Sequence, residues 1–166
     1  HHYQISLQQE NLKLPKFLRF GWIGAYGEGW ALYCESLGPE FGLYTDPHQK
    51  MGSLSDEMLR AVRLVIDTGI HTGQMSREEA IKYFLSNVAY DEASATAEVE
   101  RYMAMPGQVL SYKIGQMKIR ELREKYQKQL GKKFKIADFH DGVLSQGCLP
   151  LQVLERKMDL WAKSVK

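Results

Sequence analysis

The chain has 166 residues, of which 44% are hydrophobic and 25% charged, and its formal net charge is +2 at pH 7. This composition is typical of a globular domain with a hydrophobic core, and the near-neutral charge does not indicate binding to nucleic acid or to an anionic membrane. No stretch is apolar over a length that would span a bilayer. Cys34 and Cys148 form no CxxC pair. We expect them to be small buried residues, and a single bridge between them stays open.

Helical periodicity dominates the sequence and strand alternation is almost absent, so an all-α fold is expected. A first helix is predicted over residues 2–9, before Pro15. The next is expected to begin at Phe17 and end at Leu37 (residues 17–37), and it is apolar on nearly every side, which is typical of a buried helix. Glycines weaken a helix intrinsically, and these four are expected where another backbone comes close: Gly21, Gly24, Gly27 and Gly29.

Turn and capping signals divide the remaining sequence into further helices. Ser76 and Glu79 are spaced as a capping box, and Gly131 is placed to end a long helix. Helices are predicted over about residues 53–69, 76–87, 92–103, 108–130 and 137–145, and from Pro150 onward. The sequence therefore predicts a single all-helical unit over residues 1–166, with seven or eight helices packed around the buried helix 17–37.

Glu28 is the most informative single residue, because it is a carboxylate in the apolar stretch 25–35. An unpaired carboxylate is costly to bury and usually finds a cation. His1 and His2 precede it, and two imidazoles with a distant glutamate are a possible zinc-binding set. Neighbouring residues on a helix point in different directions, so we expect one histidine to be a ligand and the other to contact that ligand or the substrate. The alternative is that the pair is the remainder of a purification tag.

Four further residues could support such a site. Glu35 lies two helical turns after Glu28 and could orient a ligand histidine, or could face solvent or an arginine. Arg63, Asp67 and His71 are spaced by four residues, so Asp67 could bond to His71 or pair with Arg63. That row could bind substrate, or it could be a structural row of ion pairs.

Two tyrosines lie close to a break in the helical pattern at Pro106 and Gly107. A phenol near a metal can donate a hydrogen bond to an oxyanion, and a helix start leaves backbone N–H groups that can hold an anion or a carbonyl. Tyr102 and Tyr112 are the candidates, and the alternative is that both pack in the core. His48 and His140 are isolated and are expected to be surface or hydrogen-bonded residues.

Several long stretches, in order and over essentially the whole chain, resemble the bacterial domain-of-unknown-function family 885. That family resembles the all-helical gluzincin metallopeptidases. The stretches are His-His-Tyr-Gln at 1–4, Ala-Tyr-Gly-Glu-Gly-Trp-Ala-Leu-Tyr-Cys-Glu at 25–35, residues 60–71, residues 101–108, Tyr-Lys at 112–113 and Phe-His-Asp at 139–141.

The resemblance implies a role for each matching residue. His1 or His2 would be the second zinc-binding histidine, and Glu28 would be the downstream glutamate ligand. Tyr102 or Tyr112 would stabilise the oxyanion. Arg63 and His71 would line the substrate cleft. Beside these residues, we expect Gln108 to bind substrate, and Glu35 and Asp67 to be supporting residues.

The family carries a His-Glu-Ala-x-Pro-Gly segment immediately before the histidine pair, and this chain begins after it. We therefore expect the C-terminal part of a longer bacterial zinc peptidase that acts on short peptides. Zn²⁺ would be bound by the full-length protein, and this part alone should neither hydrolyse peptides nor hold zinc tightly. The missing N-terminal portion would cover the apolar face of helix 17–37, whose exposure could drive self-association, and it would also decide between cytoplasm and export.

The alternative function is a non-catalytic helical module that binds peptides or a partner protein. A role in nucleic acid binding is not expected, because no basic patch interleaved with aromatic residues is visible.

Overall fold

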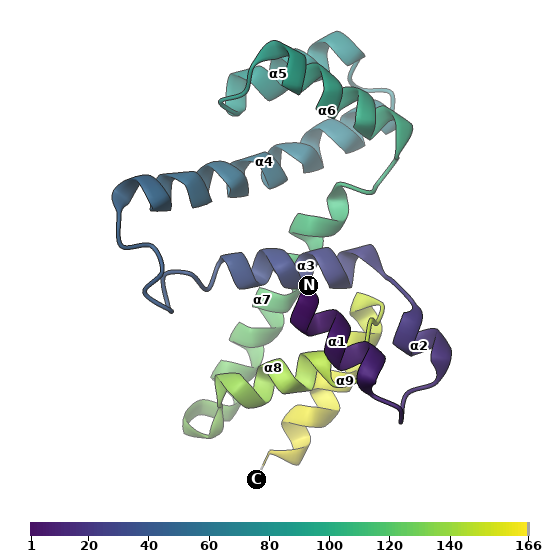
Figure 1. Cartoon of the computed structure of the whole chain (residues 1–166), viewed down its shortest axis with the longest axis vertical. Coiled ribbons are helices and arrows are strands. Elements are labelled where there is room, and N and C mark those ends of the chain that lie inside the picture. The colour runs from purple at the N-terminus through teal and green to yellow at the C-terminus, as the bar shows by residue number, and fades with distance from the viewer. Residues whose placement is uncertain (166) are drawn as a thin grey trace. The chain divides into compact units, whose positions relative to one another are not determined.

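The computed structural model describes residues 1–165, and the regular elements of these residues are all helices, without any β-strand (Figure 1). The all-α prediction is confirmed. The elements are α1 (His2–Glu10), α2 (Lys16–Phe20), α3 (Gly24–Glu35), α4 (Pro47–His71), α5 (Arg77–Asn87), α6 (Glu92–Ala104), α7 (Leu110–Leu130), the 3-10 turn η1 (Gly131–Lys133), α8 (Ile136–Leu144) and α9 (Leu151–Ser164). Within residues 1–165, no helix is both long enough and apolar enough to cross a membrane.

The chain divides into two compact units. The terminal unit comprises His1–Tyr33 and Ile114–Lys166, and the central unit comprises Cys34–Lys113. In the terminal unit α1 contacts both α2 and α8, and α8 contacts α9. In the central unit α4, α5 and α6 pack against one another.

The predicted single helix over residues 17–37 is wrong, because the chain leaves the helical path at Gly21. Here the backbone is extended (φ −74°, ψ 153°), and α3 begins only at Gly24. The cause is a tertiary contact: the buried Gln8 side chain donates to the carbonyl oxygens of Leu18 (2.7 Å) and Gly21 (2.9 Å). Burial is correctly predicted for half of the residues of α3 but not for α2, which has no buried residue.

Gly29 on α3 and Gly115 on α7 allow two backbones to approach closely in the terminal unit. A Cβ atom added to Gly115 would overlap the carbonyl oxygen of Ala25, and one added to Gly29 would overlap the Gly115 backbone. The prediction of a close backbone approach is therefore confirmed for Gly29. The buried Gln116 side chain, one residue further along α7, donates to the carbonyl oxygen of Leu32 and adds a polar contact between the same helices.

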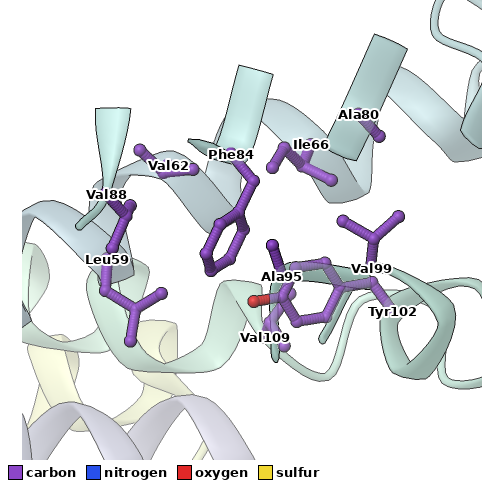
Figure 2. Close-up of a cluster of buried hydrophobic side chains, with 10 residues drawn as sticks. All are labelled: Leu59, Val62, Ile66, Ala80, Phe84, Val88, Ala95, Val99, Tyr102 and Val109. Atoms are coloured by element: carbon purple, nitrogen blue, oxygen red, sulfur yellow. The ribbon is translucent and has the colours of Figure 1, made fainter. Parts of the chain in front are cut away.

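The central unit has its own hydrophobic core, drawn in Figure 2. Its side chains come from α4, α5, α6 and the segments that follow α5 and α6. The cluster consists of Leu59, Val62, Ile66, Ala80, Phe84, Val88, Ala95, Val99, Tyr102 and Val109.

Helix ends in this unit follow local capping chemistry. The capping box of Ser76 and Glu79 is present at the start of α5, as predicted. α4 begins earlier than the predicted residue 53, because the Asp46 carboxylate accepts the backbone N–H of His48 and Pro47 suits the first turn.

Cys34 and Cys148 are both free thiols. Cys148 is buried as expected, whereas Cys34 is half-buried.

Candidate functional site

His1 and Glu28 lie side by side in the terminal unit, although they are far apart in sequence. His1 Nε2 is 3.0 Å from Glu28 Oε2, and the Glu28 side chain is 18% exposed. On its other side, His1 Nδ1 is 3.3 Å from Oε1 of the buried Gln4. The His2 side chain is exposed and makes no hydrogen bond, ion pair or ring contact with any described residue. Of the two candidate histidines, His1 is therefore the one beside Glu28.

The hydrogen bonding of His1 determines what can lie between it and Glu28. When Nδ1 donates its proton to Gln4, a neutral imidazole presents a lone pair at Nε2. A carboxylate oxygen also presents lone pairs, so the two groups repel unless a cation lies between them. That cation is either a proton, which makes His1 an imidazolium, or a metal ion that both groups bind.

The pair is incomplete as a metal site within residues 1–165. No group of three or more His, Cys, Asp or Glu side chains in this part of the chain could hold a metal ion. A catalytic zinc site uses three protein ligands and a water. His1 and Glu28 thus have the chemistry of two such ligands, and a third would have to come from elsewhere.

Two glutamines of α1 support this region but were not among the candidates predicted from the sequence, because those candidates were chosen mainly for ionisable or aromatic side chains. Gln4 and Gln8 are 2% and 4% exposed. The Gln4 side chain contacts His1, and the Gln8 side chain donates to the carbonyl oxygen of Leu18. Residues 1, 4 and 8 are spaced to lie on one face of a helix, and this spacing could have predicted that Gln4 and Gln8 lie on the same side as His1. Gln4 fixes His1, and Gln8 fixes the link between α2 and α3.

In the central unit, Arg63 is held between two tyrosines and a carboxylate. Its Nε donates to the Tyr102 hydroxyl (3.0 Å) and its Nη2 donates to Glu98 Oε2 (2.8 Å). The guanidinium also lies 5.4 Å from the centre of the Tyr112 ring. Arg63 is 9% exposed, so this network is largely buried. Glu98 was not among the sequence candidates.

The two candidate tyrosines differ in how their hydroxyl groups are used. Tyr102 is fully buried and its hydroxyl donates to Glu98 Oε2 (2.7 Å), while burial raises the pKa of Tyr102 to about 12. Tyr112 is half-buried, and its hydroxyl has no hydrogen-bond partner among the described residues. Of the two, only Tyr112 has a hydroxyl available to a ligand.

The prediction that Asp67 bonds to His71 or pairs with Arg63 is wrong. Both Asp67 oxygens accept the backbone N–H of Gly107, at 3.0 and 3.1 Å, and Asp67 is 2% exposed. The anion expected at this break is therefore Asp67 itself, and Gly107 accommodates the bend with a φ of +78°. His71 instead donates from Nε2 to the Tyr102 carbonyl oxygen (3.1 Å).

The other candidates make ordinary contacts. Gln108 Oε1 accepts a hydrogen bond from Arg101 (3.1 Å), and Glu35 lies at the exposed end of α3 in the central unit. His48 is exposed beside Asp46, and His140 bonds through Nε2 to the Tyr33 hydroxyl (2.8 Å), as expected for isolated histidines. The predicted site residues are thus shared between the two units, with His1, His2 and Glu28 in the terminal one.

Stability should fall in acid because of Glu98. Burial alone would raise the pKa of Glu98, but hydrogen bonds from Arg101, Tyr102 and Arg63 lower it from 4.5 to about 2. A carboxyl with a depressed folded-state pKa stabilises the fold fully above its unfolded-state pKa and loses that contribution as pH falls through the folded value. With the side chain 24% exposed, and so partly screened by water, we expect a loss of about 2 kcal/mol between pH 5 and about pH 2.

Urea unfolding at pH 7, 5, 4, 3 and 2.5 measures this change. The Glu98→Gln variant should show a smaller decline over the same interval, since it lacks the titrating group. Equal declines in both proteins would mean that other carboxyls account for the acid sensitivity.

The chain belongs to the family of bacterial proteins of unknown function DUF885, which matches residues 1–158. It is 46% identical to a solved protein of Colwellia psychrerythraea, described as a "putative lipoprotein", with a TM-score of 0.95 over 98% of this chain and 28% of that one. A solved "putative lipoprotein of unknown function" of Shewanella oneidensis is 27% identical, with a TM-score of 0.86 over 95% of this chain and 29% of that one. The chain thus spans less than a third of the length of these relatives. No curated protein matches it significantly.

Proposed function

We propose that the protein is part of a zinc-dependent peptidase of the gluzincin type that acts on short peptides. The observation that carries the proposal is the distance of 3.0 Å between His1 Nε2 and Glu28 Oε2. The fold around this pair is all-helical, as it is in the gluzincin peptidases. Histidine from one helix and glutamate from a second are the ligand types of hydrolytic zinc sites. The surrounding contacts add support, because Gln4 holds His1 with Nε2 toward the carboxylate.

The residues present fit a zinc ion in kind but not in number. His1 would bind through Nε2 and Glu28 through its carboxylate, and the third ligand and the base would come from outside this chain. That the solved relatives are more than three times as long is consistent with such a division. Bound zinc would lower the pKa of a water molecule and polarise the peptide carbonyl.

The chain's own contribution would then be to position the ligands. Gln4 keeps the proton of neutral His1 on Nδ1, and α3 presents Glu28 from the turn that follows Gly24. The packing of Gly29 against Gly115 sets the position of that helix. The assignments of Tyr102, Tyr112, Arg63, His71 and Gln108 in the central unit remain predictions.

A second candidate is a non-catalytic helical module that binds peptides or a partner protein. It is favoured by the absence of a third ligand beside His1 and Glu28 within the described residues. In that case the His1–Glu28 contact is an ion pair that stabilises the junction of α1 with α3. Peptide binding would then survive removal of metal.

Hydrolysis by the full-length protein separates the two candidates. We expect cleavage of short peptides that a chelator abolishes and zinc restores, and a loss of at least about a hundredfold in kcat/KM for Glu28→Ala. Glu124→Ala is the matched control, because Glu124 is an exposed glutamate of α7 in the same unit. Hydrolysis that persists in Glu28→Ala, or that is insensitive to chelation, would contradict the peptidase proposal.

A further inference from the structure

Trp22 is an exposed aromatic residue that the terminal unit nevertheless holds firmly. It lies in the link between α2 and α3 and is 49% exposed. Large exposed side chains are common on protein surfaces, and exposure alone indicates nothing. What distinguishes Trp22 is the number of interior groups that fix its backbone and its ring.

Buried polar groups hold the link at both ends. Before Trp22, the Gln8 side chain binds the carbonyl oxygens of Leu18 and Gly21. After it, the backbone N–H of Ile23 donates to the sulfur of buried Cys148 (3.0 Å). The three-residue link between α2 and α3 is therefore anchored to α1 on one side and to the segment before α9 on the other.

The ring is also held, against the same helix that carries Glu28. A Cβ atom at Gly27 would overlap the Trp22 ring, so glycine at this position makes room for the indole. The ring meets His1 edge-on, with centroids 5.6 Å apart and planes at 62°. Trp22 thus contacts His1 and the residue before Glu28, while about half of its surface stays open.

We infer that Trp22 forms the wall of a subsite that receives an apolar or aromatic side chain of the peptide beside the His1–Glu28 pair. A pre-positioned indole offers a large apolar contact area and loses little conformational entropy when a ligand packs on it. Its position would place that side chain next to the reacting bond. This inference rests on the proposed function, since it names the substrate class of the same site.

Peptide titrations followed by NMR of the indole N–H groups test the inference on this chain. The chain has three tryptophans, and the signal of Trp22 is identified by its loss in Trp22→Phe. The probes are acetyl-Gly-Phe-Gly-amide and acetyl-Gly-Ser-Gly-amide. We expect the phenylalanine peptide to shift the Trp22 signal but not that of buried Trp30, and to bind at least about tenfold more tightly than the serine peptide.

Two substitutions complete the test. Trp22→Ala should weaken binding of the phenylalanine peptide at least about tenfold, whereas Trp22→Phe should weaken it less than about threefold. Phe17→Ala, at another exposed aromatic residue, should change nothing. Circular dichroism and thermal unfolding confirm that each variant is folded. If Trp22→Ala does not fold, the indole shift and the difference between the two peptides in the unaltered chain decide the matter.

Failure of this inference is distinguishable from failure of the peptidase proposal. Equal binding of both peptides, no binding of either, or binding that leaves the Trp22 signal unchanged would each overturn the subsite. None of these results depends on zinc, because the titration is done without metal. The peptidase proposal fails instead through unchanged hydrolysis in Glu28→Ala.

Discussion

Replacing Gly115 with alanine should destabilise the protein by about 3 kcal/mol or more, which is a large fraction of the stability of a typical domain. The added methyl group would overlap the carbonyl oxygen of Ala25 and the Cα atom of Gly29. Both obstacles are backbone atoms, so no side-chain rotation relieves the overlap and α3 must move away from α7. Thermal unfolding by circular dichroism, together with urea unfolding, measures the loss.

Gly52→Ala is the matched control for Gly115→Ala. Gly52 is also a helical glycine, but it is exposed in α4 and a Cβ atom there would meet nothing within 4 Å. Alanine is the better helix former by about 1 kcal/mol, so this variant should be at least as stable as the unaltered protein. Equal unfolding midpoints for the two variants would contradict the close approach of α3 and α7.

Glu98→Gln should destabilise the central unit by about 3 kcal/mol. The substitution keeps the shape of the side chain but removes the charge that faces Arg63, which is 9% exposed. Removing one partner of a buried ion pair leaves the other charge without compensation in a poorly hydrated place. Tyr102 also loses its charged acceptor. Urea unfolding at pH 7 is the measurement.

Two further variants show whether burial is the cause. Arg77→Gln breaks the exposed ion pair of Arg77 with Glu100 and should leave the midpoint nearly unchanged. The double variant with Arg63→Met and Glu98→Gln should lose less free energy of unfolding than the two single variants lose together, because it has no uncompensated buried charge. Additive losses would mean that Arg63 and Glu98 contribute independently and would contradict the buried network.

Local signals in the sequence predicted the parts of the fold that local chemistry determines. The capping box of Ser76 and Glu79 begins α5 as expected, and α3 is buried as its apolar composition indicates. The break at Gly21 was missed because its cause is Gln8, which is distant in sequence and carries no charge. The continuous apolar pattern of residues 17–37 does not indicate that a glutamine of α1 donates hydrogen bonds to two backbone carbonyl groups of this segment.

In the candidate site too, sequence reasoning succeeded where a local pattern was informative and failed where the partner is distant in sequence. Glu28 attracted attention because a carboxylate in an apolar stretch needs a partner, and His1 lies beside it. For Asp67, regular helical spacing suggested Arg63 or His71, but the closest donor is a backbone N–H on another segment. Glu98 was missed because one glutamate on an amphipathic helix resembles any other until the buried arginine that faces it is known.

The zinc content of the full-length protein tests the central claim most directly. Elemental analysis of purified protein should give about one zinc per chain for the unaltered sequence and for the Glu124→Ala control, and a clear loss for Glu28→Ala. That result would establish Glu28 as a ligand and make the His1–Glu28 contact part of a metal centre. No zinc in the unaltered protein, or the same content in Glu28→Ala, would contradict the account and leave the helical binding module as the better description.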